Sequence, residues 1–152
     1  MLLKKHPAIL ESNLSARTQD GFMPLQQALV SGKEANVYLV LELLSQYPEV
    51  YEDNLMNKNR YGYNCLHQAA NSGNHKWIRR FILDLKTVFR NEWHEPAEIL
   101  IEDKRKFLKI GFPEVNRILS QNGYRAQARE NFAYQRSEDF NNLDRRSRNS
   151  YR

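Results

Sequence analysis

The sequence predicts an all-α fold of about two and a half to three stacked helix-turn-helix repeats, followed by a polar C-terminal tail. The first observation behind this prediction is a match of the chain to itself at an offset of 41 residues. Residues 2–32 align with residues 43–73 without a gap and share twelve identities in 31 positions, where average composition gives roughly two by chance. The second observation is that apolar residues inside each matching segment recur at helical spacing around a glycine.

The clearest unit spans residues 59–90, where two helices are expected on either side of a glycine. Leu66 and the Ala69-Ala70 pair share one helical face at i, i+3 and i+4. Gly73 then ends this first helix, as a glycine does at a helix C-terminus. A second helix follows, because Trp77, Ile78, Phe81 and Ile82 repeat the same spacing.

Other units are predicted around this one. Residues 2–17 form a partial unit, residues 18–58 a full unit, and residues 100–124 a degenerate unit whose first helix is too highly charged to be recognised easily. Because the chain begins inside a unit, it is expected to be either a capped array or the edge of a longer one. Residues 125–152 are expected to extend the last helix for two turns and then to end in a solvated tail.

The repeat resembles the ankyrin repeat, whose pattern is Asp/Asn-x-x-Gly-x-Thr-Pro-Leu-His-x-Ala-Ala-x-x-Gly-His. This pattern is matched by Asn59, by Leu66-His67 and by the two glycines of the unit, Gly62 and Gly73. It is not matched at Asn64 and Cys65, which stand where the pattern has Thr and Pro. The 41-residue period exceeds the usual 33, so we assign the surplus to insertions near residues 34–36 and 46–49. A different helical repeat of about 40 residues is the alternative. The resemblance implies a structural role for the following residues: Gly21, Leu25, Gly32, Gly62, Leu66, His67, Ala69, Ala70 and Gly73.

Composition restricts the remaining possibilities. A single cysteine, Cys65, allows no intrachain disulfide and favours a reducing compartment. An intracellular location, cytoplasmic or nuclear, is therefore expected, with the interior of a host cell as an alternative. No apolar run is long enough to cross a membrane. The net charge of +5 is compatible with acidic partners without requiring nucleic acid. The arginine cluster at residues 145–148 is interpreted as part of a solvated tail, with a nuclear-localisation signal or an acidic-partner contact as alternatives.

No recognisable catalytic or metal-binding motif accompanies the repeat. Cys65 has no neighbouring base in the sequence, and the histidines lack zinc-ligand spacing. The ankyrin resemblance gives His67 a structural role, in which the imidazole ties the start of the first helix to neighbouring backbone. We therefore expect no enzymatic activity, no metal, no cofactor and no small-molecule substrate.

Binding of another protein is the predicted function. In the ankyrin arrangement, the residues around the first glycine of a unit form the tip of a loop, and the end of the first helix lines a concave face. Arginine and tyrosine are enriched in binding hot spots, which favours Arg60 and Tyr61 as anchors, while Phe22 and Tyr63 could equally pack between adjacent loops. The expected partner-binding residues are Gln19, Asp20, Phe22, Val30, Arg60, Tyr61, Tyr63, Asn71 and Ser72.

Two further readings follow from the same resemblance. Short ankyrin arrays of viruses and intracellular bacteria, including some similar to the inhibitor of NF-kappa-B, act as adaptors or inhibitors of host regulators, so a transcription factor of the NF-kappa-B type is one expected partner. A fragment or subunit of a larger ankyrin-containing protein is the alternative function.

Overall fold

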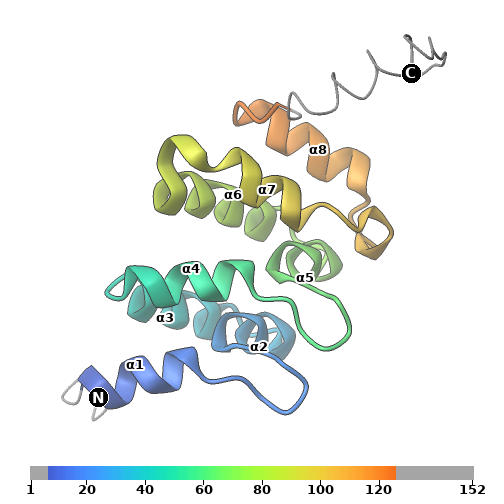
Figure 1. The fold of residues 1–152 in the computed structure, drawn as a ribbon. Coiled ribbons are helices and arrows are strands. Elements are labelled where there is room, and N and C mark those ends of the chain that lie inside the picture. Colours follow the sequence, from blue (N-terminus) through green and yellow to red (C-terminus); the bar gives the residue numbers. More distant parts are fainter. Residues whose placement is uncertain (1–6, 126–152) are drawn as a thin grey trace, which may run out of the picture.

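The computed structural model describes residues 7–125, and these residues form an all-α structure without strands. The expected all-α fold is therefore confirmed. Residues 1–6 and 126–152, including the predicted helix extension and the arginine-rich tail, lie outside the described part of the chain. The helices follow one another in layers from α1 at one end to α8 at the other (Figure 1).

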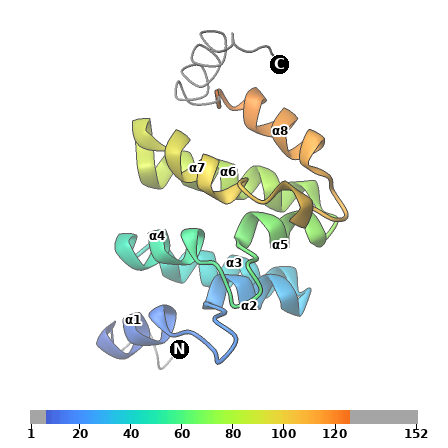
Figure 2. The ribbon, with the colours of Figure 1, turned by 45° about the vertical axis from the view of Figure 1, so that its right-hand side comes forward.

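The 41-residue repeat corresponds to three helices per unit. The first unit contains α1 (Pro7–Ser15), α2 (Pro24–Ser31) and α3 (Glu34–Leu44), and the second contains α4 (Pro48–Met56), α5 (Cys65–Asn71) and α6 (His75–Phe89). Each helix of the second unit begins 41 residues after its counterpart. Helices α2 and α3 pack together, as do α5 and α6, and α2 also packs on α5 in the next layer. Figure 2 shows the layers from a second side.

The expected loop insertion after residue 44 is wrong, because the surplus residues form α4. Pro48 occupies the first turn, where its missing N–H costs nothing. Val50, Tyr51 and Leu55 are buried at helical spacing and pack toward α3 and α6. The surplus residues therefore build a helix that covers the outer side of the layer.

The C-terminal unit also differs from expectation. A helix not assigned from sequence, α7 (His94–Leu100), follows the short 3-10 helix η2 (Arg90–Glu92) and buries Ala97 and Leu100. The charged segment expected to hold a first helix forms only a turn of 3-10 helix, η3 (Lys104–Lys106), before α8 (Phe112–Gln121). Three adjacent cations with few apolar neighbours offer no face for a longer helix to bury.

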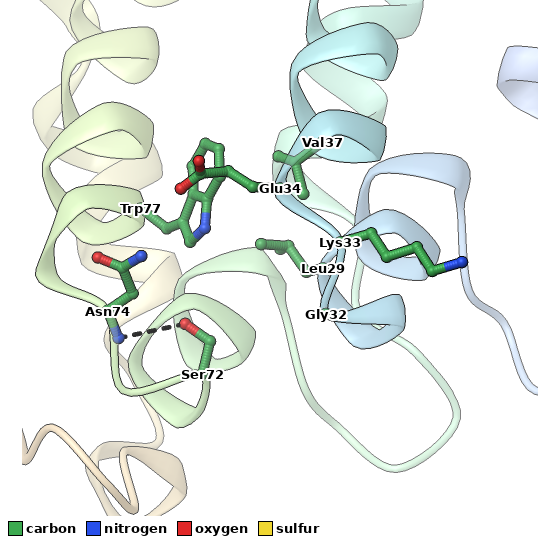
Figure 3. Close-up of a pocket in the computed structure, with 8 residues that line it drawn as sticks. All are labelled: Leu29, Gly32, Lys33, Glu34, Val37, Ser72, Asn74 and Trp77. Carbon is green, nitrogen blue, oxygen red and sulfur yellow. Dashed lines mark hydrogen bonds between the residues drawn. The ribbon is translucent and has the colours of Figure 1, made fainter.

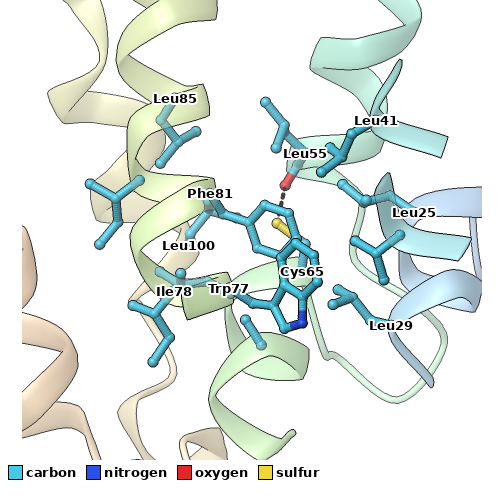
Figure 4. Close-up of a cluster of buried hydrophobic side chains, with 14 of the residues drawn as sticks. Leu25, Leu29, Leu41, Leu55, Cys65, Trp77, Ile78, Phe81, Leu85 and Leu100 are labelled. Atoms are coloured by element: carbon cyan, nitrogen blue, oxygen red, sulfur yellow. Dashed lines mark hydrogen bonds between the residues drawn. The ribbon is translucent and has the colours of Figure 1, made fainter. Parts of the chain in front are cut away.

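The core lies between the layers and is continuous from α1 to α8. Positions expected in the core from helical spacing, Leu66, Ala69, Ala70, Trp77, Ile78 and Phe81, are all buried. Trp77 and Phe81 of α6 lie opposite Leu25, Leu29 and Leu41 of the preceding unit (Figure 4). The small alanines of α5 allow close packing of helices, and the two aromatic rings fill the space between units. None of the described helices has the length and apolar character needed to cross a bilayer.

Candidate protein-binding surface

Three loops leave the same side of the layers, and they carry most of the predicted binding residues (Figure 1). The first loop covers residues 16–23, the second residues 57–64 and the third residues 101–111. The first and second loops contain the same turn. In the first, Thr18 N donates to Phe22 O and Gly21 N to Thr18 O, both at 2.9 Å. In the second, the equivalent bonds from Asn59 N to Tyr63 O and from Gly62 N to Asn59 O are also 2.9 Å long.

Side chains at the start of each turn complete it. The Thr18 hydroxyl accepts from Phe22 N at 3.0 Å. The Asn59 carboxamide oxygen accepts from both Tyr61 N and Tyr63 N, at 2.9 and 3.0 Å. Short polar side chains that bond nearby backbone amides favour turns over helices. The tips of both loops are therefore held in one conformation before any partner binds.

The two turns are also joined to each other. Arg60 N donates to Asp20 O at 2.8 Å, and the Arg60 guanidinium pairs with the Asp20 carboxylate at 3.1 Å. The Asn57 carboxamide donates to Gly21 O at 2.8 Å. Because the side chains of Arg60 and Asp20 keep 63% and 45% of their surface open to solvent, their ion pair contributes little to stability. The backbone bond and the Asn57 bond set the spacing of the loops.

Glycine at position 21 is required both by its backbone angle and by this close approach. Its φ is +83°, and a Cβ there would lie 3.1 Å from Arg60 N. Gly32 has a similar φ of +74°, but a Cβ there would meet open space. A side chain at position 32 would therefore cause backbone strain alone, whereas a side chain at position 21 would cause both backbone strain and a steric conflict with the second loop.

We predict that Gly21→Ala lowers the free energy of unfolding by about 2–3 kcal/mol, and Gly32→Ala by about 1 kcal/mol. Both variants carry the strain of an alanine at positive φ, but only the first pushes the second loop away. Urea unfolding followed by circular dichroism measures both. Equal losses in the two variants would show that the spacing of the loops does not contribute to stability.

His67 lies at the junction of the second and third loops and is almost fully buried. Asn64 N donates to its Nδ1 at 3.1 Å, and the Asn64 carboxamide oxygen accepts from His67 N at 2.9 Å. The Nε2 lies 3.0 Å from Asp103 O in the third loop. An amide N–H can only donate and a carbonyl can only accept, so these partners select the neutral tautomer with the proton on Nε2. Burial lowers the pKa of His67 to about 4, and the Asp103 carbonyl and carboxylate oppose this effect.

Gln26 makes the equivalent connection one unit earlier, since it lies 41 residues before His67. Its Nε2 donates to Tyr63 O in the second loop at 2.8 Å. Each first helix thus carries a buried polar side chain that bonds the backbone of the next loop. The self-match of the sequence aligns Gln26 with His67, but Gln26 was not among the predicted structural residues.

The predicted binding residues differ in how available they are. Gln19, Arg60, Tyr61, Val30 and Ser72 are exposed, and Tyr61 and Val30 are large apolar side chains with 56% and 58% exposure. Phe22 and Asp20 are half-buried, as is Tyr63, which packs edge-on against His67. Asn71 bonds the third loop: its oxygen accepts from Leu108 N at 2.7 Å, and its amide donates to Lys106 O at 3.1 Å.

A small hollow lies between the two units, beside the turns that join α2 to α3 and α5 to α6. Its volume is about 180 Å³. Leu29, Val37 and Trp77 supply its apolar wall, and Lys33, Glu34, Ser72 and Asn74 supply polar groups (Figure 3). Asn74 N donates to the Ser72 hydroxyl at 3.3 Å, which links these two lining residues. The hollow is large enough to receive one side chain of a partner.

Cys65 is buried, and its thiol lies 3.2 Å from Leu55 O. Burial raises the pKa of this thiol well above its usual value, so it stays protonated. Within residues 7–125, no group of three or more His, Cys, Asp or Glu side chains is placed to hold a metal ion.

Comparisons with protein-family models, with curated proteins and with solved structures gave no match.

Proposed function

We propose that this chain is a repeat protein of the ankyrin type that binds another protein and catalyses no reaction. The observation that supports the proposal best is the pair of pre-formed, cross-linked turns that display Arg60 and Tyr61. The guanidinium carbon of Arg60 lies 5.7 Å from the centre of the Tyr61 ring, so the two side chains form one exposed unit. A rigid, exposed arginine-aromatic pair loses little conformational entropy on binding.

Repeat proteins use the surface formed by corresponding positions of successive units as a binding face. Here that surface runs from the first and second loops to the exposed ends of α2 and α5, where Val30 and Ser72 lie. The partner would be a regulatory protein, with a transcription factor of the NF-kappa-B type as one candidate, and the chain would act as an adaptor or inhibitor.

Changing Arg60 and Tyr61 to alanine together should weaken partner binding about thirtyfold or more, because loss of a hot spot costs about 2 kcal/mol. The partner is first isolated by affinity capture, and its affinity for each purified variant is then measured by calorimetry. Urea unfolding shows whether the fold is retained.

The matched control removes an arginine and a large exposed side chain from a different surface. Arg79 and Leu83 lie on α6, both exposed, and Leu83 has 54% exposure. The control double variant should bind as the wild type does. If the Arg60-Tyr61 variant loses less than about threefold in affinity, or if the control loses as much, the loops are not the binding surface.

A further inference from the structure

Charge is unevenly divided between the three loops and the three helices that lead into them. The loops carry seven Lys and Arg side chains against three carboxylates. Helices α1, α4 and α7 carry six carboxylates and no Lys or Arg: Glu11, Glu49, Glu52, Asp53, Glu95 and Glu98. The loop side is therefore positive and the leading helices are negative, although residues 7–125 as a whole are close to neutral.

Most of the positive charge lies on the third loop, which is held against the second. The ammonium group of Lys106 lies 5.2 Å from the centre of the Tyr63 ring. Ile110 N donates to Ala70 O at 3.3 Å, and Asn71 bonds the backbone at residues 106 and 108. These bonds hold the third loop against the second, and Lys106 of the third loop and Lys58 of the second both lie close enough to His67 for their charges to lower its pKa.

Only part of this charge is neutralised inside the molecule. Asp103 pairs with Lys106 at 3.0 Å, and its contact with Arg105 is long, at 3.6 Å. Among the described residues no carboxylate forms an ion pair with Lys58, Lys104 or Lys109. The side chain of Arg105 is 94% exposed. We name these four residues, Lys58, Lys104, Arg105 and Lys109, the basic cluster.

Two large apolar side chains are exposed on the two loops that carry the basic cluster. Leu108 is 66% exposed on the third loop and Tyr61 is 56% exposed on the second. The backbone of Leu108 is held in place, because its N–H donates to the Asn71 side chain at 2.7 Å. Exposed apolar side chains on loops with a surplus of cations suit a ligand that carries both carboxylates and an apolar group.

We propose that the basic cluster, with Tyr61 and Leu108, binds an acidic segment of the partner protein that also carries an apolar side chain. This inference rests on the proposed function and specifies the chemistry of its partner. The carboxylates of α4 and α7 repel the same segment, so the field of the molecule directs it to the loops. Those carboxylates, together with Glu102 and Asp103 in the third loop, disfavour nucleic acid, which requires a broad positive surface.

The test is a selection of random peptides displayed on phage against the purified chain, repeated with two variants. The first reverses the third loop, with Lys104→Glu, Arg105→Glu and Lys109→Glu. The second is a control with the same change in net charge elsewhere, at the exposed residues Arg79, Arg90 and Arg125. Urea unfolding checks that both variants fold. Selected peptides and a labelled single-stranded DNA are then titrated by fluorescence anisotropy at low and high salt.

The expected result is enrichment of acidic peptides that contain an apolar residue. Their affinity should fall at least about tenfold in the third-loop variant and change little in the control. Added salt should weaken binding to the wild type and have little further effect on the third-loop variant.

Other outcomes separate the two proposals. The acidic-ligand inference is overturned, and the proposed function stands, if the selected peptides are not acidic. The same conclusion follows if their affinity is unchanged by the third-loop reversal but falls when Arg60 and Tyr61 are changed to alanine. If no peptide is enriched, or if neither change affects binding, both fail. Equally tight DNA binding that depends on the third loop would replace the acidic segment with nucleic acid as ligand.

Discussion

Replacing Asp84 by alanine is expected to lower the free energy of unfolding by about 3 kcal/mol or more, since the change leaves a partly buried cation without its partner. Asp84 of α6 is buried, and its carboxylate accepts from Arg80 Nε at 3.0 and 3.2 Å. The carboxylate also accepts a hydrogen bond from the buried Tyr51 of α4. This group therefore joins the outer helix of the second unit to α6.

The electrostatics of this group are dominated by burial. Burial raises the pKa of the Asp84 carboxyl above its usual value, and the bonds from Tyr51 and Arg80 oppose this rise. Burial also raises the pKa of Tyr51, and the Asp84 charge adds to this effect, so the hydroxyl stays protonated and can donate. Removing the carboxylate would leave both donors without an acceptor in a region that water reaches poorly.

A double-mutant cycle with Arg80→Ala tests this account by urea unfolding. We expect the double variant to be clearly more stable than the sum of the two single changes predicts, because the second change removes the stranded cation. The apolar set Tyr51→Phe, Arg80→Met and Asp84→Leu, which leaves no donor without an acceptor, should recover most of the lost stability. Strictly additive losses would mean that Arg80 and Asp84 do not depend on each other.

The second large effect is a loss of stability when His67 becomes protonated. The imidazole has a pKa of about 4 in the folded chain against 6.5 ordinarily. As the pH falls below 6.5, the unfolded chain takes up this proton first, so the unfolded state is favoured. The stabilisation from neutral His67 is therefore complete above pH 6.5, falls between pH 6.5 and 4, and amounts to about 2–3 kcal/mol.

Burial of His67 is the main reason for its low pKa, and the bond between Asn64 N and Nδ1 of His67 gives a second, geometric one. A proton on Nδ1 would replace this acceptor with a donor facing another donor. The expected measurement is a set of urea unfolding curves from pH 4 to 7.5. Nuclear magnetic resonance of the imidazole should show a pKa well below that of an exposed histidine.

The chain supplies its own control for this prediction. Gln26 occupies the equivalent position in the first unit and bonds the next loop without a titratable group. His67→Gln should retain the fold and remove the difference in stability between pH 6.5 and 4 that His67 causes. His75 and His94 remain in both proteins, so the difference between the two curves reports on His67 alone. Superimposable curves would exclude a buried neutral His67.

The sequence by itself determined the features that depend on local interactions. Glycines spaced 11 residues apart and apolar residues at helical spacing predicted α2, α5 and α6, because these signals lie within a few residues of one another. The same spacing predicted which faces of α5 and α6 are buried. The loop tips with Arg60 and Tyr61 could also be located, because each tip precedes its glycine by a fixed number of residues.

Tertiary packing alone decided the rest. Helices α4 and α7 have nine and seven residues, which is too few for a helix to be stable in isolation. They are stabilised only when neighbouring helices bury side chains such as Leu55 and Leu100. The third loop is held against the end of α5 by bonds that Asn71 makes to residues 106 and 108, more than thirty positions away in sequence. The Asp84 group likewise joins α4 to α6. Contacts between residues so far apart leave no periodic pattern in a sequence, because they depend on how the layers stack.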